Sequence, residues 1–220
     1  MKYFQKNSDI SSLRPAFGML CLVWSCTLFQ TLLLQFLCPF LLPAPPSQSG
    51  QSLFFILSCV FAGLNLLCWL GKLLAFRILA CCSASEISYG NLLGHACWLF
   101  FWLETICFLS IHLVFFLQIQ PAAVFSAKFW SGQILTLSLL LFAWQAAAAR
   151  LNFRAVLFFQ FALVFFAAVH LFRLIHFGVG FRPSEALLNL ESCLLLRHFS
   201  SILCTLSAAF GFYFFWRKPE

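Results

Sequence analysis

Long apolar runs, separated by short polar stretches, follow one another along nearly the whole chain. A helix needs about 20 predominantly apolar residues to cross a bilayer, and the chain offers such a run six times. The approximate ranges of the runs are 17–42, 53–74, 92–117, 130–149, 155–177 and 199–216. The pattern predicts an all-α fold, a polytopic membrane helix bundle with about six transmembrane helices spanning 17–216.

Outside these runs little of the chain is available for a soluble domain. Residues 1–16 and 217–220 are predicted to be short tails. The stretch Arg182–His198 differs from a simple loop, because Pro183 and Ser184 are typical helix starters and leucines follow at helical spacing. It predicts a short amphipathic helix on the outer membrane face. An outward extension of the sixth helix is the alternative.

Composition agrees with a membrane environment. Of the 220 residues, 63% are hydrophobic and 9% are charged, whereas a soluble domain carries about 25% charged residues. The net charge is +7, but the basic residues stand at the ends of apolar runs and form no patch interleaved with aromatics. We therefore expect an integral, multi-pass protein with the lipid bilayer as its surroundings and no nucleic acid as a partner; the type of membrane is not indicated.

The basic residues also predict the orientation of the helices. With the N-terminus in the cytoplasm, three basic residues fall on the outer side (Lys128, Arg182 and Arg197), and nine fall on the inner side (Lys2, Lys6, Arg14, Lys72, Arg77, Arg150, Arg154, Arg217 and Lys218). This excess follows the positive-inside rule and predicts that both tails are cytoplasmic. Residues 1–43 resemble a signal peptide, but the apolar run exceeds the usual 7–15 residues, which favours a retained helix.

Glu104 is the one carboxylate in the middle of an apolar run. At 1.5 Å per residue it lies about 18 Å from either end of the 92–117 run. A charge facing lipid there costs roughly 2.5–3.5 kcal/mol, so Glu104 should face the interior of the bundle. It is a candidate proton or cation site, together with Gln145 and with Arg173 as a possible ion-pair partner. Alternatively, Glu104 forms a structural hydrogen bond between helices, to Gln145, Gln30 or Asn65.

Histidines gather on the outer side of the predicted topology. His112 lies in the third run, and His170 and His176 flank Arg173 in the fifth. His112 and His170 have similar predicted depth, which a haem b held between two histidines would require, and imidazoles also bind other metals. Without any specific ligand spacing, we favour histidines that only mark the membrane interface, and we predict no cofactor.

Sequence motifs for catalysis are missing. The chain has no H-E-x-x-H, no P-loop, no G-x-G-x-x-G and no G-x-S-x-G, and its eleven cysteines include no C-x-x-C. Small residues at 145–150, at 207–211 and at Ala62–Gly63 predict close helix packing or contact with a partner subunit.

Three function classes remain. We favour a non-enzymatic membrane subunit or assembly factor, with other membrane protein subunits as partners. The alternatives are a small transporter or channel-like protein that uses Glu104, and a membrane-embedded haem or lipid-modifying enzyme that uses the outer histidines.

Overall fold

Six long helices make up the part of the chain that the structure describes. The structure is a computed structural model, and it describes residues 13–33, 48–81, 90–116, 122–181 and 190–217. Within these ranges there is no strand, and each helix is long and apolar enough to cross a membrane. The helices are α1 (Arg14–Leu32), α3 (Gln48–Cys81), α4 (Gly90–Phe116), α5 (Ala122–Ala149), α6 (Phe153–Phe181) and α7 (Leu190–Trp216). The predicted all-helical bundle of six apolar helices is confirmed.

Several helices extend beyond the apolar runs that predict them. α3 continues to Cys81 instead of ending near residue 74, and α5 begins at Ala122 instead of residue 130. Each extension carries a basic residue, Arg77 in α3 and Lys128 in α5. A long basic side chain can lie along an apolar surface while its charged end reaches water. A basic residue therefore interrupts the apolar run in the sequence although the helix continues. The predicted first run continues to residue 42, but residues 34–47 lie outside the described ranges.

The stretch predicted as an amphipathic surface helix is described in its second half only. Residues 190–198 form the first turns of α7 and continue without a break into the membrane-spanning part. These residues are thus continuous with the last helix, and the surface helix and its alternative, an outward extension of that helix, both stay predictions. Residues 182–189 lie outside the described ranges, so a surface helix there stays a prediction.

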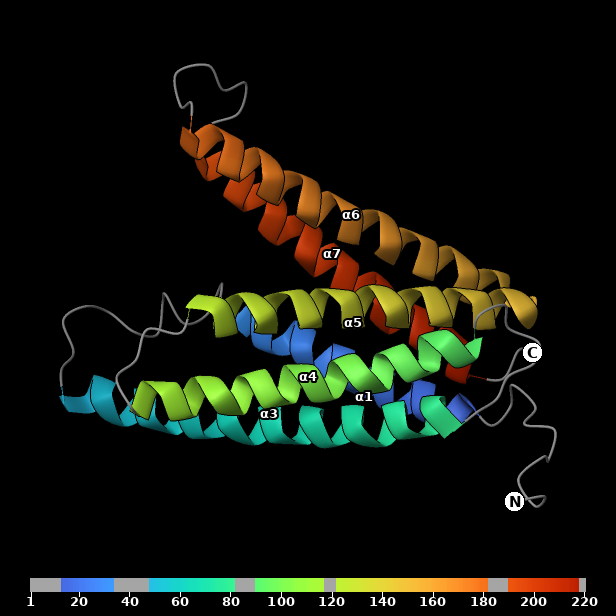
Figure 1. The fold of residues 1–220 in the computed structure, drawn as a ribbon, viewed down its shortest axis with the longest axis horizontal. Helices are drawn as coiled ribbons and strands as arrows, with labels where there is room; N and C mark the ends of the chain where they lie inside the picture. The colour runs from blue at the N-terminus through green and yellow to red at the C-terminus, as the bar shows by residue number, and fades with distance from the viewer. Residues whose placement is uncertain (1–12, 34–47, 82–89, 117–121, 182–189, 218–220) are drawn as a thin grey trace.

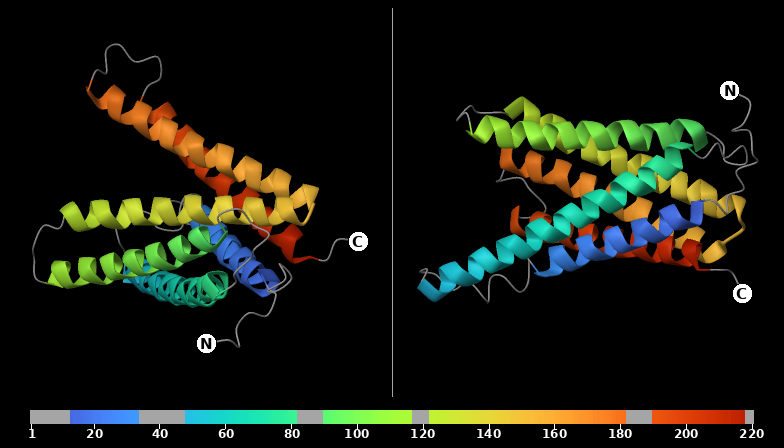
Figure 2. Two further views of the ribbon diagram at one scale, coloured as in Figure 1. Left: turned by 45° about the vertical axis from the view of Figure 1, so that its right-hand side comes forward. Right: turned by 90° about the horizontal axis from the view of Figure 1, so that it is seen from below.

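The six helices form a closed ring in chain order. Each helix packs against the next one along the chain, and α7 packs back against α1, while α5 and α7 touch only slightly across the ring. In Figure 1 and Figure 2, the hairpin of α6 and α7 diverges from α3, α4 and α5 towards the end of the bundle away from Arg14 and Trp216. The ring therefore surrounds an interior that all six helices can reach.

The first turns of α1 and the last turns of α7 lie side by side. The Phe17 and Phe215 rings meet edge to face with centroids 4.3 Å apart, and a Cβ on Gly18 would lie 3.0 Å from the Trp216 ring. Both described ends of the chain are thus at one end of the bundle, as an even number of crossings requires. The cytoplasmic location of this end is still a prediction.

Small residues allow close packing in α5 and α7, as their sequences predict. Ala146 and Ala147 are fully buried, and a Cβ on Gly211 would lie only 2.7 Å from the Phe159 ring of α6. In α3, by contrast, Ala62 is exposed, and nothing lies within 4 Å of a Cβ placed on Gly63. Ala62 and Gly63 therefore make no close contact within the described parts of this chain.

A tight turn joins α5 to α6 and ties them to the end of α7. Leu151 has a positive φ of 54°, and the Asn152 amide donates to the Ala147 carbonyl over 3.1 Å, which closes α5 with a Schellman turn. The Asn152 side chain accepts a hydrogen bond from the Ala155 amide and donates one of 2.9 Å to the Phe214 carbonyl. Asn152 thus caps α6 and holds α7 with one amide group.

Candidate functional site

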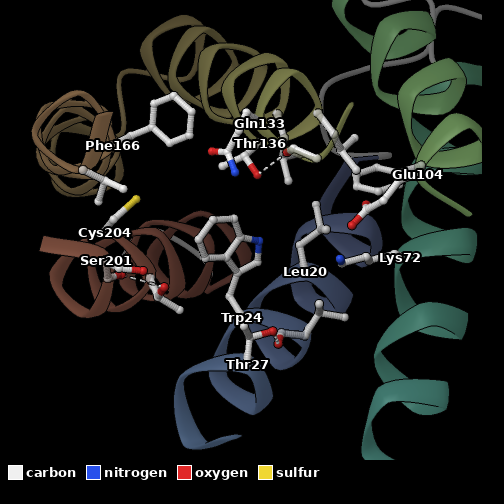
Figure 3. Close-up of a pocket in the computed structure, with 17 residues that line it drawn as sticks. Leu20, Trp24, Thr27, Lys72, Glu104, Gln133, Thr136, Phe166, Ser201 and Cys204 are labelled. Atoms are coloured by element: carbon white, nitrogen blue, oxygen red, sulfur yellow. Dashed lines mark hydrogen bonds between the residues drawn. The ribbon is translucent and has the colours of Figure 1, made fainter. Parts of the chain in front are cut away.

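A cavity of about 260 Å³ lies inside the ring of helices, and every one of the six helices contributes to its lining (Figure 3). A cavity of roughly 150 Å³ is large enough to hold benzene, so this one has room for a small organic molecule. The lining residues are Leu20, Val23, Trp24 and Thr27 of α1, Lys72 and Phe76 of α3, Glu104 of α4, Gly132, Gln133, Leu135, Thr136 and Leu139 of α5, Phe166 and Val169 of α6, and Ser201, Cys204 and Thr205 of α7.

Helical spacing explains why residues far apart in sequence line one cavity. Residues three, four and seven positions apart share a helix face. In α1 the lining positions 20, 23, 24 and 27 have this spacing, as do 132, 135, 136 and 139 in α5 and 201, 204 and 205 in α7. Each helix therefore presents one stripe to the interior, and polar residues on these stripes are removed from lipid.

Glu104 lies on the cavity wall, as the prediction of an interior position requires. It lies fourteen residues after Gly90 and twelve before Phe116, so it is about 18–21 Å from each end of α4. Its neighbour on α5 is Gly132, where an added Cβ would be 3.6 Å from Glu104 Oε1. The missing side chain at Gly132 leaves the carboxylate uncovered on the cavity side.

Lys72 occupies a different position from the one its sequence suggests. We counted it among the inner-side basic residues because the predicted run ended near residue 74. In the structure α3 continues to Cys81, and Lys72 lies inside the membrane-spanning part and lines the cavity. In Figure 3 the side chains of Lys72 and Glu104 point into the same space from adjacent helices, although no ion pair links these two described residues.

Three threonines give the cavity hydrogen-bond acceptors. The hydroxyls of Thr27, Thr136 and Thr205 each donate over 2.9 Å to the backbone carbonyl four residues earlier, at Val23, Gly132 and Ser201. Because each hydroxyl uses its one proton on its own helix, its oxygen keeps lone pairs that accept from a ligand. This pattern favours ligand groups that carry N–H or O–H donors.

Gln133 connects the cavity to one of the predicted histidines. Gln133 Oε1 and His170 Nε2 are 3.1 Å apart, and since the amide oxygen can only accept, the imidazole donates. The amide nitrogen of Gln133 is then the group that can donate into the cavity. His170 itself does not appear among the lining residues; it lies behind Gln133 against the Phe166 ring, with centroids 4.6 Å apart.

Charged and uncharged groups lie on opposite sides of the cavity. We call Lys72 of α3 and Glu104 of α4 the charged wall, and Phe166, Ser201 and Cys204 of α6 and α7 the neutral wall (Figure 3). Cys204 donates its thiol to the Ala162 carbonyl over 3.3 Å, which further reduces the polarity of the neutral wall. A ligand that fills the cavity would meet both signs of charge on one side and a weakly polar surface on the other.

Two other predicted site residues lie outside this cavity. The Arg173 guanidinium stacks on the Phe129 ring, 3.6 Å from its centroid, and the Gln145 side chain is half-buried with its Oε1 without a hydrogen-bond partner in the described structure. Neither appears in the lining, and Glu104 has no hydrogen bond to Gln145, Gln30 or Asn65 within the described ranges. Asn65 is exposed on α3. Of the predicted intramembrane residues, only Glu104 lies in the cavity.

The predicted haem or metal site at the outer histidines stays a prediction, because of its three histidines only the His170 side chain is described. His112 lies in α4 and His176 in α6, but their side chains are outside what the structure describes. Among the residues that are described, no group of three or more His, Cys, Asp or Glu side chains is placed to hold a metal ion.

The most informative residue that sequence reasoning missed is Lys72. The apolar residues that continue after Arg77 as far as Cys82 were the available signal, because a run extended to this point puts Lys72 well inside it. The threonines and serines of the lining gave no such signal, since hydroxyl side chains are common in membrane helices. A comparison with protein-family models, with curated proteins and with solved structures finds no match.

Proposed function

We propose that the protein is a small transporter or channel-like membrane protein that binds a small polar solute within its helix ring and uses Glu104 as an intramembrane proton site. The observation that supports this proposal is the cavity at mid-span, lined by all six helices and by Glu104 and Lys72. Ionisable residues within membrane helices typically face a water-filled cavity and mark a substrate or ion path. Substrate sites of transporters also lie near the bilayer midplane.

The orientation that we propose follows the basic residues. Arg14, Arg77, Arg150, Arg154 and Arg217 lie at the end of the bundle that holds the start of α1 and the end of α7. The positive-inside rule then makes this end cytoplasmic. With Lys72 removed from the count, because it lies within the span, the excess of basic residues on this side persists.

Glu104→Gln tests the proposed transport. In liposomes that contain the purified protein and a pH-sensitive dye, we expect the wild type to dissipate an imposed pH gradient and Glu104→Gln to do so at least tenfold more slowly, because the amide cannot carry the charge. Glu191→Gln, which removes a carboxylate ten residues before Ser201 of α7, is the matched control and should keep the wild-type rate. An unchanged rate in Glu104→Gln contradicts the proposal; an aggregated Glu104→Gln protein supports a structural role instead.

A second candidate function is a membrane subunit or assembly factor of a larger complex. The exposed Asn65 in the spanning part of α3 favours it, since an amide that faces lipid gains a hydrogen bond from a partner helix. Nearby Ala62 and Gly63 leave space for close approach. Under this function, the protein co-purifies with other membrane subunits in mild detergent, and Asn65→Leu removes them while Leu66→Ala, at an exposed apolar neighbour, does not. Purification as a free single chain contradicts this candidate.

A further inference from the structure

The two charged residues of the cavity indicate what kind of ligand it takes. Lys72 and Glu104 come from neighbouring helices, line one wall, and form no ion pair with each other. A pure cation would satisfy Glu104 and be repelled by Lys72, and a pure anion would have the opposite problem. A molecule with a cationic and an anionic group a few ångströms apart satisfies both at once, because each of its charges meets the opposite charge.

We propose that the cavity binds a small zwitterion that carries an ammonium group, an oxyanion and a weakly polar remainder. This inference rests on the proposed function and specifies its substrate class. The ammonium group lies at the Glu104 carboxylate, and the carboxylate or phosphate of the ligand lies at the Lys72 ammonium. The remainder of the ligand extends across the cavity towards Phe166 and Cys204 on the neutral wall.

Uncharged groups of the lining fit both ends of such a ligand. An ammonium group has three N–H donors, and the threonine oxygens of Thr27 and Thr136 accept hydrogen bonds, since their own protons are donated to their helices. The Gln133 amide nitrogen is a further donor in the lining, since His170 holds the amide oxygen. The lining therefore offers both hydrogen-bond acceptors and donors in addition to the two charges.

The size of the cavity suits a small molecule as the ligand. With about 260 Å³, the cavity lies below the roughly 300–1,000 Å³ range of pockets for drug-sized ligands. A free amino acid with an apolar side chain fits this limit, and so does the ethanolamine phosphate headgroup of a phospholipid. Both sources share the chemistry of an ammonium group and an oxyanion on one short carbon frame.

A matched set of three compounds tests the inference on the wild-type protein. L-Leucine has both charges, 3-methylbutylamine is leucine without its carboxylate, and 4-methylpentanoate is leucine without its ammonium group. We expect leucine to raise the thermal unfolding midpoint of the detergent-purified protein, and the other two to bind roughly tenfold to hundredfold more weakly, as the loss of a hydrogen bond to a charged group implies. If either single-charge compound binds as tightly as leucine, the zwitterion inference is wrong.

The source of the zwitterion is tested with headgroup compounds. Glycerophosphoethanolamine as a soluble compound, and bilayer nanodiscs with and without phosphatidylethanolamine, replace leucine in the same measurement. Stabilisation by these compounds and not by leucine assigns the cavity to a lipid headgroup and keeps the inference. Lack of stabilisation by any zwitterion of the set overturns it.

Two variants assign each end of the ligand to its residue. In Glu104→Gln the ammonium group has lost its partner, so leucine and 4-methylpentanoate should bind equally weakly. In Lys72→Met, which keeps the length of the unbranched stem and removes the ammonium group, leucine and 3-methylbutylamine should bind equally weakly. Removing a charge from the ligand and its partner from the protein, separately and together, forms a double-mutant cycle. If a substitution lowers the affinity for all three compounds equally, the assignment is wrong.

Failure of this inference is distinguishable from failure of the proposed function. Flux through liposomes that depends on Glu104, combined with tight binding of a single-charge compound, overturns the zwitterion and keeps the transporter. Absence of both flux and ligand binding overturns both.

Discussion

Gly94→Ala is expected to lower the free energy of unfolding by about 1–3 kcal/mol, the usual cost of inserting a methyl group where there is no room. A Cβ on Gly94 would lie 2.7 Å from the backbone oxygen of Leu79 and 3.3 Å from its carbonyl carbon. The obstacle is helix backbone, which cannot rotate away as a side chain does. α4 must therefore move away from α3, and this movement lowers the free energy of unfolding. The higher helix propensity of alanine than of glycine, worth roughly 1 kcal/mol, offsets part of that loss.

Gly63→Ala is the matched control for this variant. Gly63 lies within α3, as Gly94 lies within α4, but nothing is within 4 Å of the Gly63 Cβ position, so alanine there should raise the free energy of unfolding by roughly 1 kcal/mol. Thermal unfolding of both variants in one detergent gives the comparison. Equal stability of Gly94→Ala and Gly63→Ala would contradict the close approach of α3 and α4 at Leu79.

The same variant should also disturb the cavity. Lys72 lies two helical turns before Leu79 on α3, and Glu104 lies ten residues after Gly94 on α4. A shift between the two helices at Gly94 changes the separation of these charges. We therefore expect weaker leucine binding in Gly94→Ala, even at temperatures where the protein stays folded.

The number and type of helices could be predicted from the sequence because lipid imposes one requirement throughout. Each backbone polar group must find its partner within the segment, so every long apolar run becomes a helix. The interior position of Glu104 follows from the same physics, since a carboxylate in hydrocarbon is costly. Both predictions follow from the lipid environment of each helix taken singly, and neither requires knowledge of how the helices pack together.

The cavity could not be predicted, because it depends on how helices face one another. The interior position of Lys72 can be recognised only when the end of α3 is known, and basic residues near that end make the predicted apolar run too short. Thr27, Gln133 and Thr205 belong to helices far apart in sequence, and only the closed ring of six brings them together. Hydropathy varies too little around such apolar helices to show which face is inside. The choice between a subunit and a transporter was therefore beyond the sequence, and the cavity changes which of the two we favour.

Gly132→Leu is expected to abolish ligand binding without unfolding the protein. The Cβ position of Gly132 faces the cavity and lies 3.6 Å from Glu104 Oε1, an ordinary contact distance. A leucine side chain there extends into open space of about 260 Å³, so it covers the carboxylate without displacing a helix. The change also removes a glycine from the interior of α5, which stabilises the helix by up to about 1 kcal/mol.

This gain offsets part of the cost of covering the carboxylate, so the protein should stay folded while it loses its ligand response. At a ligand concentration of a hundred times the dissociation constant, binding stabilises a folded protein by about 2.7 kcal/mol, and this increment should disappear in Gly132→Leu. Gly132→Ala, which adds only the Cβ, should keep most of it, and Gly63→Leu, on an open part of α3, should keep all of it. A full ligand response in Gly132→Leu would mean that the solute binds elsewhere. In that case Glu104 and Lys72 would need another explanation for their position, such as a direct role in holding α3, α4 and α5 together.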